Sequence, residues 1–202
     1  PFGDLYAWLG RLLSWASPDA AHDLLDRLTR AAQELPLRDD APLAVDWFNG
    51  RRTPDTNPAA RGAIAGMTIS TSAPELYAAL VEATCFGSRA IIEQFRSQRI
   101  PIERIIAVGG IAQKSPYVMQ TMADVLQLPI EVSESAQACA LGAAICASVA
   151  AGVYPDIASA QQAMAAGIGR IYTPDPSLAG HYGRRYQRYR ALGAASEQLD
   201  RA

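Results

Sequence analysis

Several features that would assign a function at once are absent from this 202-residue sequence. No apolar run approaches the ~20 residues that cross a bilayer, and the N-terminus does not resemble a signal peptide. The formal net charge of −2 creates no strong field toward nucleic acid or an anionic membrane. We therefore expect no nucleic-acid partner, no membrane partner and a cytoplasmic location.

Metal-ligating and redox-active residues are also scarce. The three cysteines, Cys85, Cys139 and Cys146, have no CxxC spacing and lie in apolar segments, which favours buried, reduced thiols. The two histidines, His22 and His181, are far apart in the sequence and have no partner motif. We therefore expect no metal site.

What is present indicates a single α/β domain. Half of the residues are hydrophobic, enough to bury one core. The chain divides into a helical region (1–35), a loop-rich region (36–73), an α/β core (74–152) and C-terminal helices (153–202). Hydrophobic period and turn residues predict short strands at 43–48 and 63–69, then a helix at 74–98, a strand at 104–108, a helix at 115–127, a strand at 129–132 and a helix at 138–151. We expect the last helix, which is small and apolar nearly all round, to be buried in the core.

The turn after the strand at 104–108 is the most informative segment. Gly109 and Gly110 let the backbone turn sharply and leave room for a flat or phosphorylated ligand. The spacing fits neither GxGxxG nor the Walker A loop. Lys114, the only lysine among eighteen basic residues, either meets phosphate as a point charge or is simply solvated. Ser115 either caps the helix that follows or bonds a ligand, and both roles are compatible.

A basic stretch near the C-terminus also has two interpretations. Residues 181–190 combine arginines with tyrosines, a composition that suits stacking on single-stranded nucleic acid. However, Tyr182, Tyr186 and Tyr189 fall near one helical face, with arginines on the others. This pattern favours a packing helix with a solvated basic side.

Three motifs, in this order, carry a resemblance that covers essentially the whole chain. They are Asp46–Arg52 followed by Arg61–Met67, then Ala107–Ser115, then Gln137–Ala144. Together they resemble the C-terminal ATP-binding domain of the FGGY carbohydrate kinases, and most closely its L-ribulokinase members. The resemblance implies an α/β fold that is part of an actin-like ATPase (ribonuclease H-like) domain, helix-rich and with a small mixed sheet. It also implies that the parent protein uses ATP, with Mg²⁺ brought by the nucleotide, to convert L-ribulose to L-ribulose 5-phosphate.

The resemblance further implies roles for individual residues. Gly109 and Gly110 would lie against the adenosine, and Gln113 and Ser115 could bond purine or ribose. Gly66 would contact the adenine side, unless it is only a turn glycine. A second group, Asp46, Asn49 and Arg52, would either organise a loop facing the cleft through charge-assisted bonds or simply stabilise that loop.

The family's sugar contacts and catalytic aspartate belong mainly to a first domain that this sequence does not contain. We therefore expect the N-terminal sugar-binding domain as a partner, a pentulose as substrate, and no turnover by this chain alone. A homo-oligomer is the other partner that we consider, because a second copy of the chain could cover the apolar faces of the predicted helices. The alternatives are another FGGY sugar kinase, such as a xylulokinase, or a non-catalytic nucleotide-binding or scaffold module.

Overall fold

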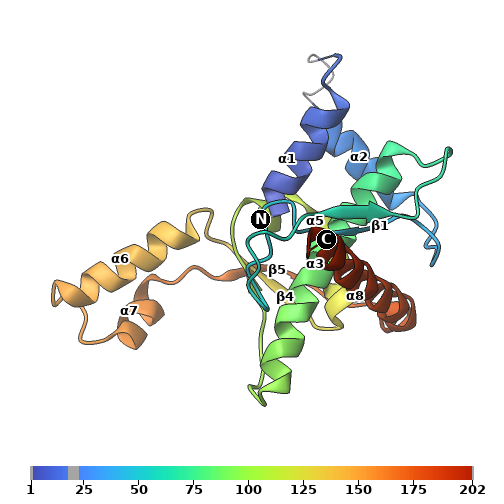
Figure 1. Ribbon diagram of the computed structural model, residues 1–202. Helices are drawn as coiled ribbons and strands as arrows, with labels where there is room; N and C mark the ends of the chain where they lie inside the picture. The colour runs from blue at the N-terminus through green and yellow to red at the C-terminus, as the bar shows by residue number, and fades with distance from the viewer. Residues whose placement is uncertain (1, 18–22, 202) are drawn as a thin grey trace.

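The computed structural model describes residues 2–17 and 23–201 and shows a helix-rich body from which one arm projects (Figure 1). The elements are α1 (Phe2–Leu13), α2 (Leu24–Gln33), β1 (Leu43–Val45), β2 (Ala63–Ala65), α3 (Ala73–Ser97), β3 (Ile106–Ala107), α4 (Gly110–Lys114), α5 (Pro116–Leu126), β4 (Ile130–Ser133), α6 (Ala138–Ala150), α7 (Ile157–Met164), β5 (Ile168–Tyr172), the short 3₁₀ helix η2 (Pro176–Leu178) and α8 (Ala179–Arg201). Each helix and strand expected between 43 and 151 is confirmed, with ends shifted by a few residues.

The described part of the chain forms two small sheets, and one of them is mixed. β3 pairs in parallel with β4, and β4 pairs antiparallel with β5, so β3 is an edge strand. β1 and β2 form a separate antiparallel pair. The strand β5 corrects our expectation of helices alone after residue 153. Its sequence, IGRIY, is short and contains a glycine, so it gives only a weak strand signal, and its pairing with β4 decides the conformation.

The helix α3 forms the centre of the core. It begins with a capping box, in which Ser72 and Glu75 bond each other's backbone N–H groups, and Pro74 occupies its first turn. Its residues between Tyr77 and Phe86 are almost all buried, because α1, α2, α5 and β1 pack around them. Its C-terminal end extends from the body (Figure 1).

The helix α8 packs through its aromatic face. Tyr182, Tyr186 and Tyr189 are buried around Phe86, with ring centroids 5.5–6.5 Å from that ring. The packing interpretation of this helix is therefore confirmed. One detail was not expected: Arg185 lies inside the protein, 1% exposed, rather than on the solvated side.

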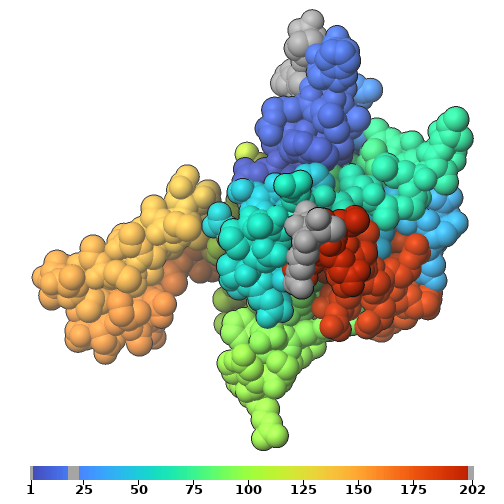
Figure 2. Space-filling view, in the orientation of Figure 1, coloured from blue at the N-terminus to red at the C-terminus, as the bar shows by residue number. Residues whose placement is uncertain are grey.

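The arm formed by α6 and α7 corrects another expectation. Figures 1 and 2 show it extending away from the body, and within the described part of the chain Ile145 is the one residue of α6 that is buried. The helix is therefore not part of this core, because the body lies away from it and α7 is its main neighbour. Cys139 and Cys146 are consequently exposed, whereas Cys85 is buried as expected. No helix in the described ranges is long and apolar enough to cross a membrane.

Candidate functional site

The Gly-Gly turn is open on its outer side. β3 ends at Ala107, and Gly109 has φ +91°, a conformation that side chains disfavour. A Cβ atom added at Gly109 or at Gly110 would meet no other atom within 4 Å. The backbone of this turn is therefore open on that side, and its contact with a nucleotide stays a prediction.

The polar side chains of this turn differ in whether they are already hydrogen-bonded within the protein. The Gln113 amide donates one N–H to the backbone carbonyl of Ser133 at the end of β4, which fixes the side chain against that strand. The Ser115 hydroxyl accepts from the N–H of Val118 at 3.4 Å, and the cap role of this serine is thus present. The Lys114 side chain is exposed in the last turn of α4. Its ammonium group is the available point charge next to the glycines.

Gly66 lies on the other sheet, directly after β2. Its φ of +76° explains the glycine as a turn residue, and an added Cβ would make only ordinary contact with Pro42, 3.8 Å away. The structure therefore supports the turn role. Its proposed contact with adenine stays a prediction.

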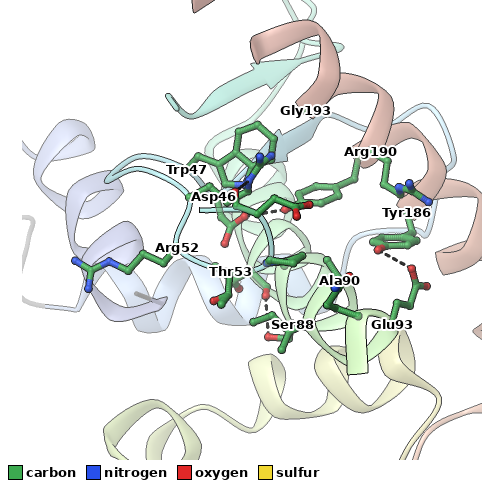
Figure 3. A pocket seen from close by; sticks show the side chains of 18 of the residues that line it. Asp46, Trp47, Arg52, Thr53, Ser88, Ala90, Glu93, Tyr186, Arg190 and Gly193 are labelled. Carbon is green, nitrogen blue, oxygen red and sulfur yellow. Dashed lines mark hydrogen bonds between the residues drawn. The ribbon is translucent and has the colours of Figure 1, made fainter. Parts of the chain in front are cut away.

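Two of the three residues in the second predicted group, Asp46 and Arg52, line a cavity of about 590 Å³ between the loop 46–55, the C-terminal half of α3 and α8 (Figure 3). Asp46 follows β1 directly, and its Oδ1 accepts from the Tyr189 hydroxyl at 3.0 Å. Burial raises the pKa of the Asp46 carboxyl, an effect that the Tyr189 bond partly offsets. Two glycines make room here: an added Cβ at Gly87 would come 2.9 Å from Asp46, and one at Gly193 would come 2.6 Å from the Trp47 ring.

The arginine that holds this loop is not the predicted one. Arg51 pairs with Glu197 at 2.7 Å and lies over the Trp47 ring, 4.6 Å from its centroid. Figure 3 shows that Arg52 instead points away from the other labelled side chains. The two adjacent arginines lie in a loop without hydrophobic periodicity, so the sequence does not show which of them faces the protein. Nor does any motif indicate that Glu197, near the C-terminus, pairs with this loop.

The predicted residues do not form one site within this chain. Asp46 and Arg52 line the loop cavity, whereas Asn49 lines an adjacent hollow of about 370 Å³ next to α1. None of the residues that line the loop cavity belongs to the segment 109–115. His22 falls outside the described residues. Among those described, no three histidine, cysteine, aspartate or glutamate side chains are placed to hold a metal.

Comparison with known proteins places the chain in a family. Residues 2–151 match the family model described as the C-terminal domain of the FGGY family of carbohydrate kinases. The chain belongs to this family. The ribulokinase of Vibrio parahaemolyticus is 46% identical over 212 aligned residues, covering 98% of this chain and 37% of that protein. The ribulokinase of Bacillus licheniformis is 40% identical over 173 residues, which is 84% of this chain and 31% of that protein.

Solved structures agree on the fold. The xylulose kinase from Rhodospirillum rubrum superimposes with a TM-score of 0.80 at 28% identity, covering 99% of this chain and 39% of that one. This FGGY domain therefore has the fold of the sugar kinases, the actin-like ATPase architecture. The chain spans between 31 and 39% of the length of these three relatives.

Proposed function

We propose that this FGGY domain is the nucleotide-binding lobe of an ATP-dependent pentulose kinase whose substrate is L-ribulose. The observation that carries the proposal is the 46% identity with a ribulokinase over nearly the whole chain. The open Gly-Gly turn supports it, because its backbone leaves space where an adenosine would lie.

The residues of the turn have complementary tasks in this proposal. The backbone at Gly109 and Gly110 accepts the flat adenosine, and the Gln113 side-chain oxygen and Ser115 orient it. Lys114 attracts phosphate through its charge. ATP supplies the phosphoryl group and brings Mg²⁺ with it. The group that deprotonates the sugar hydroxyl comes from the preceding lobe.

The partner in this proposal is the preceding lobe of the same kinase, acting in the cytoplasm. The unpaired edge of β3 and the exposed apolar surface of α6 support this partner, because both are costly to leave in water. A second copy of the chain is the alternative occupant of the same surface. A xylulose substrate is the alternative for the sugar, and the structural similarity to a xylulose kinase favours it as the second candidate.

Nucleotide binding is tested by the substitution Gly110→Val. A Cβ added at Gly110 would meet no described atom within 4 Å beyond its own stretch of chain, and the φ of Gly110 is not positive, so the fold should be retained. We expect the variant to lose the increase in Tm that ATP produces in the parent chain. Gly183→Val is the matched control, because that glycine is equally unobstructed but lies on α8. Equal ATP-induced shifts in the Gly110 variant and the parent would contradict the proposal.

Catalysis is tested by a chimera that joins this chain to the preceding part of the Vibrio parahaemolyticus ribulokinase. We expect the chimera to release ADP with L-ribulose and less with D-xylulose, and the chain alone to show no sugar-dependent release. Turnover by the chain alone would show that the catalytic base lies within it. Because the sugar contacts belong mainly to the preceding lobe, an assay of the complete parent protein with both sugars decides between L-ribulose and xylulose.

A further inference from the structure

Among the described residues, one buried side-chain nitrogen or oxygen has no hydrogen-bond partner, and it belongs to His181. This histidine lies in the first turn of α8, and its side chain is 12% exposed. Its Nε2 atom is enclosed by the protein, whereas its Nδ1 atom lies 2.9 Å from Oδ1 of Asp39, in the segment 38–42. One ring nitrogen is therefore bonded across the fold, and the other is not bonded.

The partner of Nδ1 determines which ring nitrogen carries the hydrogen. Asp39 also accepts from the Arg184 guanidinium, whose Nε lies 2.6 Å from Oδ2, and this bond holds the pKa of Asp39 below its ordinary value. An ionised carboxylate only accepts hydrogen bonds, so Nδ1 of His181 must be the donor. In the neutral ring Nε2 is then a lone pair. A second proton would have to bind at Nε2, where no described group accepts it.

The surroundings of His181 also oppose a positive charge on its ring. Burial lowers the pKa of the imidazole, and the charges of Arg185 and Arg184 on the same helix act in the same direction. Asp39 acts in the opposite direction without reversing the shift. The neutral ring is therefore the form that suits the folded structure.

The charged groups on the elements around α8 are bonded to other partners. β1 and β2, which pack on this helix, carry no titratable side chain. The remaining pairs are Glu82 on α3 with Arg185, Glu93 on α3 with Tyr186, Asp124 on α5 with the N–H of Asp175, Asp175 with Ser177, Arg38 with Asp40, and Arg188 with the backbone carbonyl of Asp39. Asp39 is thus the acid that acts on His181.

We propose that His181 is an acid-sensitive latch between the first turn of α8 and the segment 38–42. Above the ordinary pKa of a histidine, about 6.5, the neutral ring closes the latch through Asp39. On acidification the new N–H at Nε2 would be buried without an acceptor, so the ring leaves its buried position for water and its bond to Asp39 is lost. Arg185 holds the rest of the segment, because it donates to the carbonyls of Ala41 and Pro42. The latch is independent of the proposed nucleotide site.

The first test follows the imidazole nitrogens of the ¹⁵N-histidine-labelled chain by NMR, from about pH 8 to about pH 5. The sequence has two histidines, so the variant His181→Gln assigns the signals, and His22 is the reference in the same sample. We expect the neutral ring of His181 to carry its hydrogen on Nδ1. We also expect its midpoint of titration to lie below the ordinary value of about 6.5.

The second test measures amide hydrogen exchange, corrected for the direct effect of pH on the exchange reaction. The latch is fully closed above the ordinary pKa of histidine and opens as the pH falls. Protection in the segment 38–42 and in the first turns of α8 should therefore fall by up to about tenfold per pH unit, since one proton is bound. His181→Gln keeps an N–H for Asp39 but does not titrate, so this part of the loss should disappear. His22→Gln is the matched control and should behave like the parent.

Three results would overturn the proposal. The first is a hydrogen on Nε2 in the neutral ring of His181. The second is a titration midpoint of His181 at or above about 6.5. Both are measured on the parent chain and do not depend on any variant folding. The third is an equal loss of protection on acidification in the parent and in His181→Gln.

Discussion

The buried Arg185 guanidinium should be one of the largest single contributions to the stability of this domain. Its side chain is 2% exposed and joins three elements: Glu82 on α3, the carbonyls of the 38–42 segment, and its own helix α8. The substitution Arg185→Met keeps much of the volume but leaves the Glu82 carboxylate buried without a counter-charge. Breaking a buried pair in this way costs about 3–5 kcal/mol.

The expected loss is large enough to measure by two methods. For a domain of this size, each 1 kcal/mol lowers Tm by roughly 2–4 °C, so Arg185→Met should lower Tm by roughly 6–20 °C. The free energy of unfolding follows from urea titrations monitored by circular dichroism. Arg184→Met is the matched control, because the preceding arginine is 62% exposed and pairs with Asp39 at the surface. We expect little change in that variant.

The pH dependence gives a second check with a defined sign. Burial already raises the pKa of Glu82, and removal of Arg185 should raise it further, so the folded variant binds a proton that the unfolded chain releases. Its stability then falls as pH rises above the ordinary pKa of a glutamate, and the deficit relative to the parent should shrink on acidification. The double variant Glu82→Leu/Arg185→Met should recover only part of the loss, because the Ala41 and Pro42 carbonyls still lack the donor that Arg185 supplied. A loss in Arg185→Met no greater than in Arg184→Met would refute this account.

Two further predictions concern the loop cavity. Gly193→Ala should lower the free energy of unfolding by about 1–3 kcal/mol, because the new methyl group would lie 2.6 Å from the Trp47 ring. Gly183→Ala, on the same helix in open space, should be neutral or stabilising, and equal urea midpoints for the two variants would contradict the packing argument. Asp46→Asn retains an acceptor for Tyr189 and removes a carboxyl whose pKa is raised by burial. Stability of the parent relative to this variant should therefore decline as the pH rises above about 4, the ordinary pKa of an aspartate, in urea titrations. A difference that stays constant with pH would contradict a raised pKa.

Local signals were sufficient to predict the elements between residues 43 and 151, and the helix α3 shows why. Its capping residues Ser72 and Glu75 and its Pro74 act within one turn, so the sequence alone identifies where it begins. The Gly-Gly turn between β3 and α4 was predictable for the same reason. Those features depend on neighbours along the chain, not on the rest of the fold.

Features that depend on distant partners were missed. Burial of Arg185 requires Glu82, about a hundred residues earlier, and the choice of Arg51 over Arg52 requires Glu197. We predicted that α6 would be buried in this core, and it is exposed. An apolar helix indicates that another surface covers it, but the helix sequence does not show which segment or which chain provides that surface. Whether the predicted residues come together in one site also depends on distant parts of the fold, and the sequence alone does not show it.

The exposed arm has a consequence for handling and measurement. Cys139 and Cys146 are seven residues apart on α6, close to two full turns, so both thiols lie near one side of the helix about 10 Å apart. A thiol-reactive dye should modify both of these cysteines. Cys85, which is buried and whose pKa is raised by burial, should stay unmodified and serves as an internal negative control. The chain thus has a native reporter of whatever comes to lie on α6: the rate of labelling at these two positions measures how completely the arm is covered.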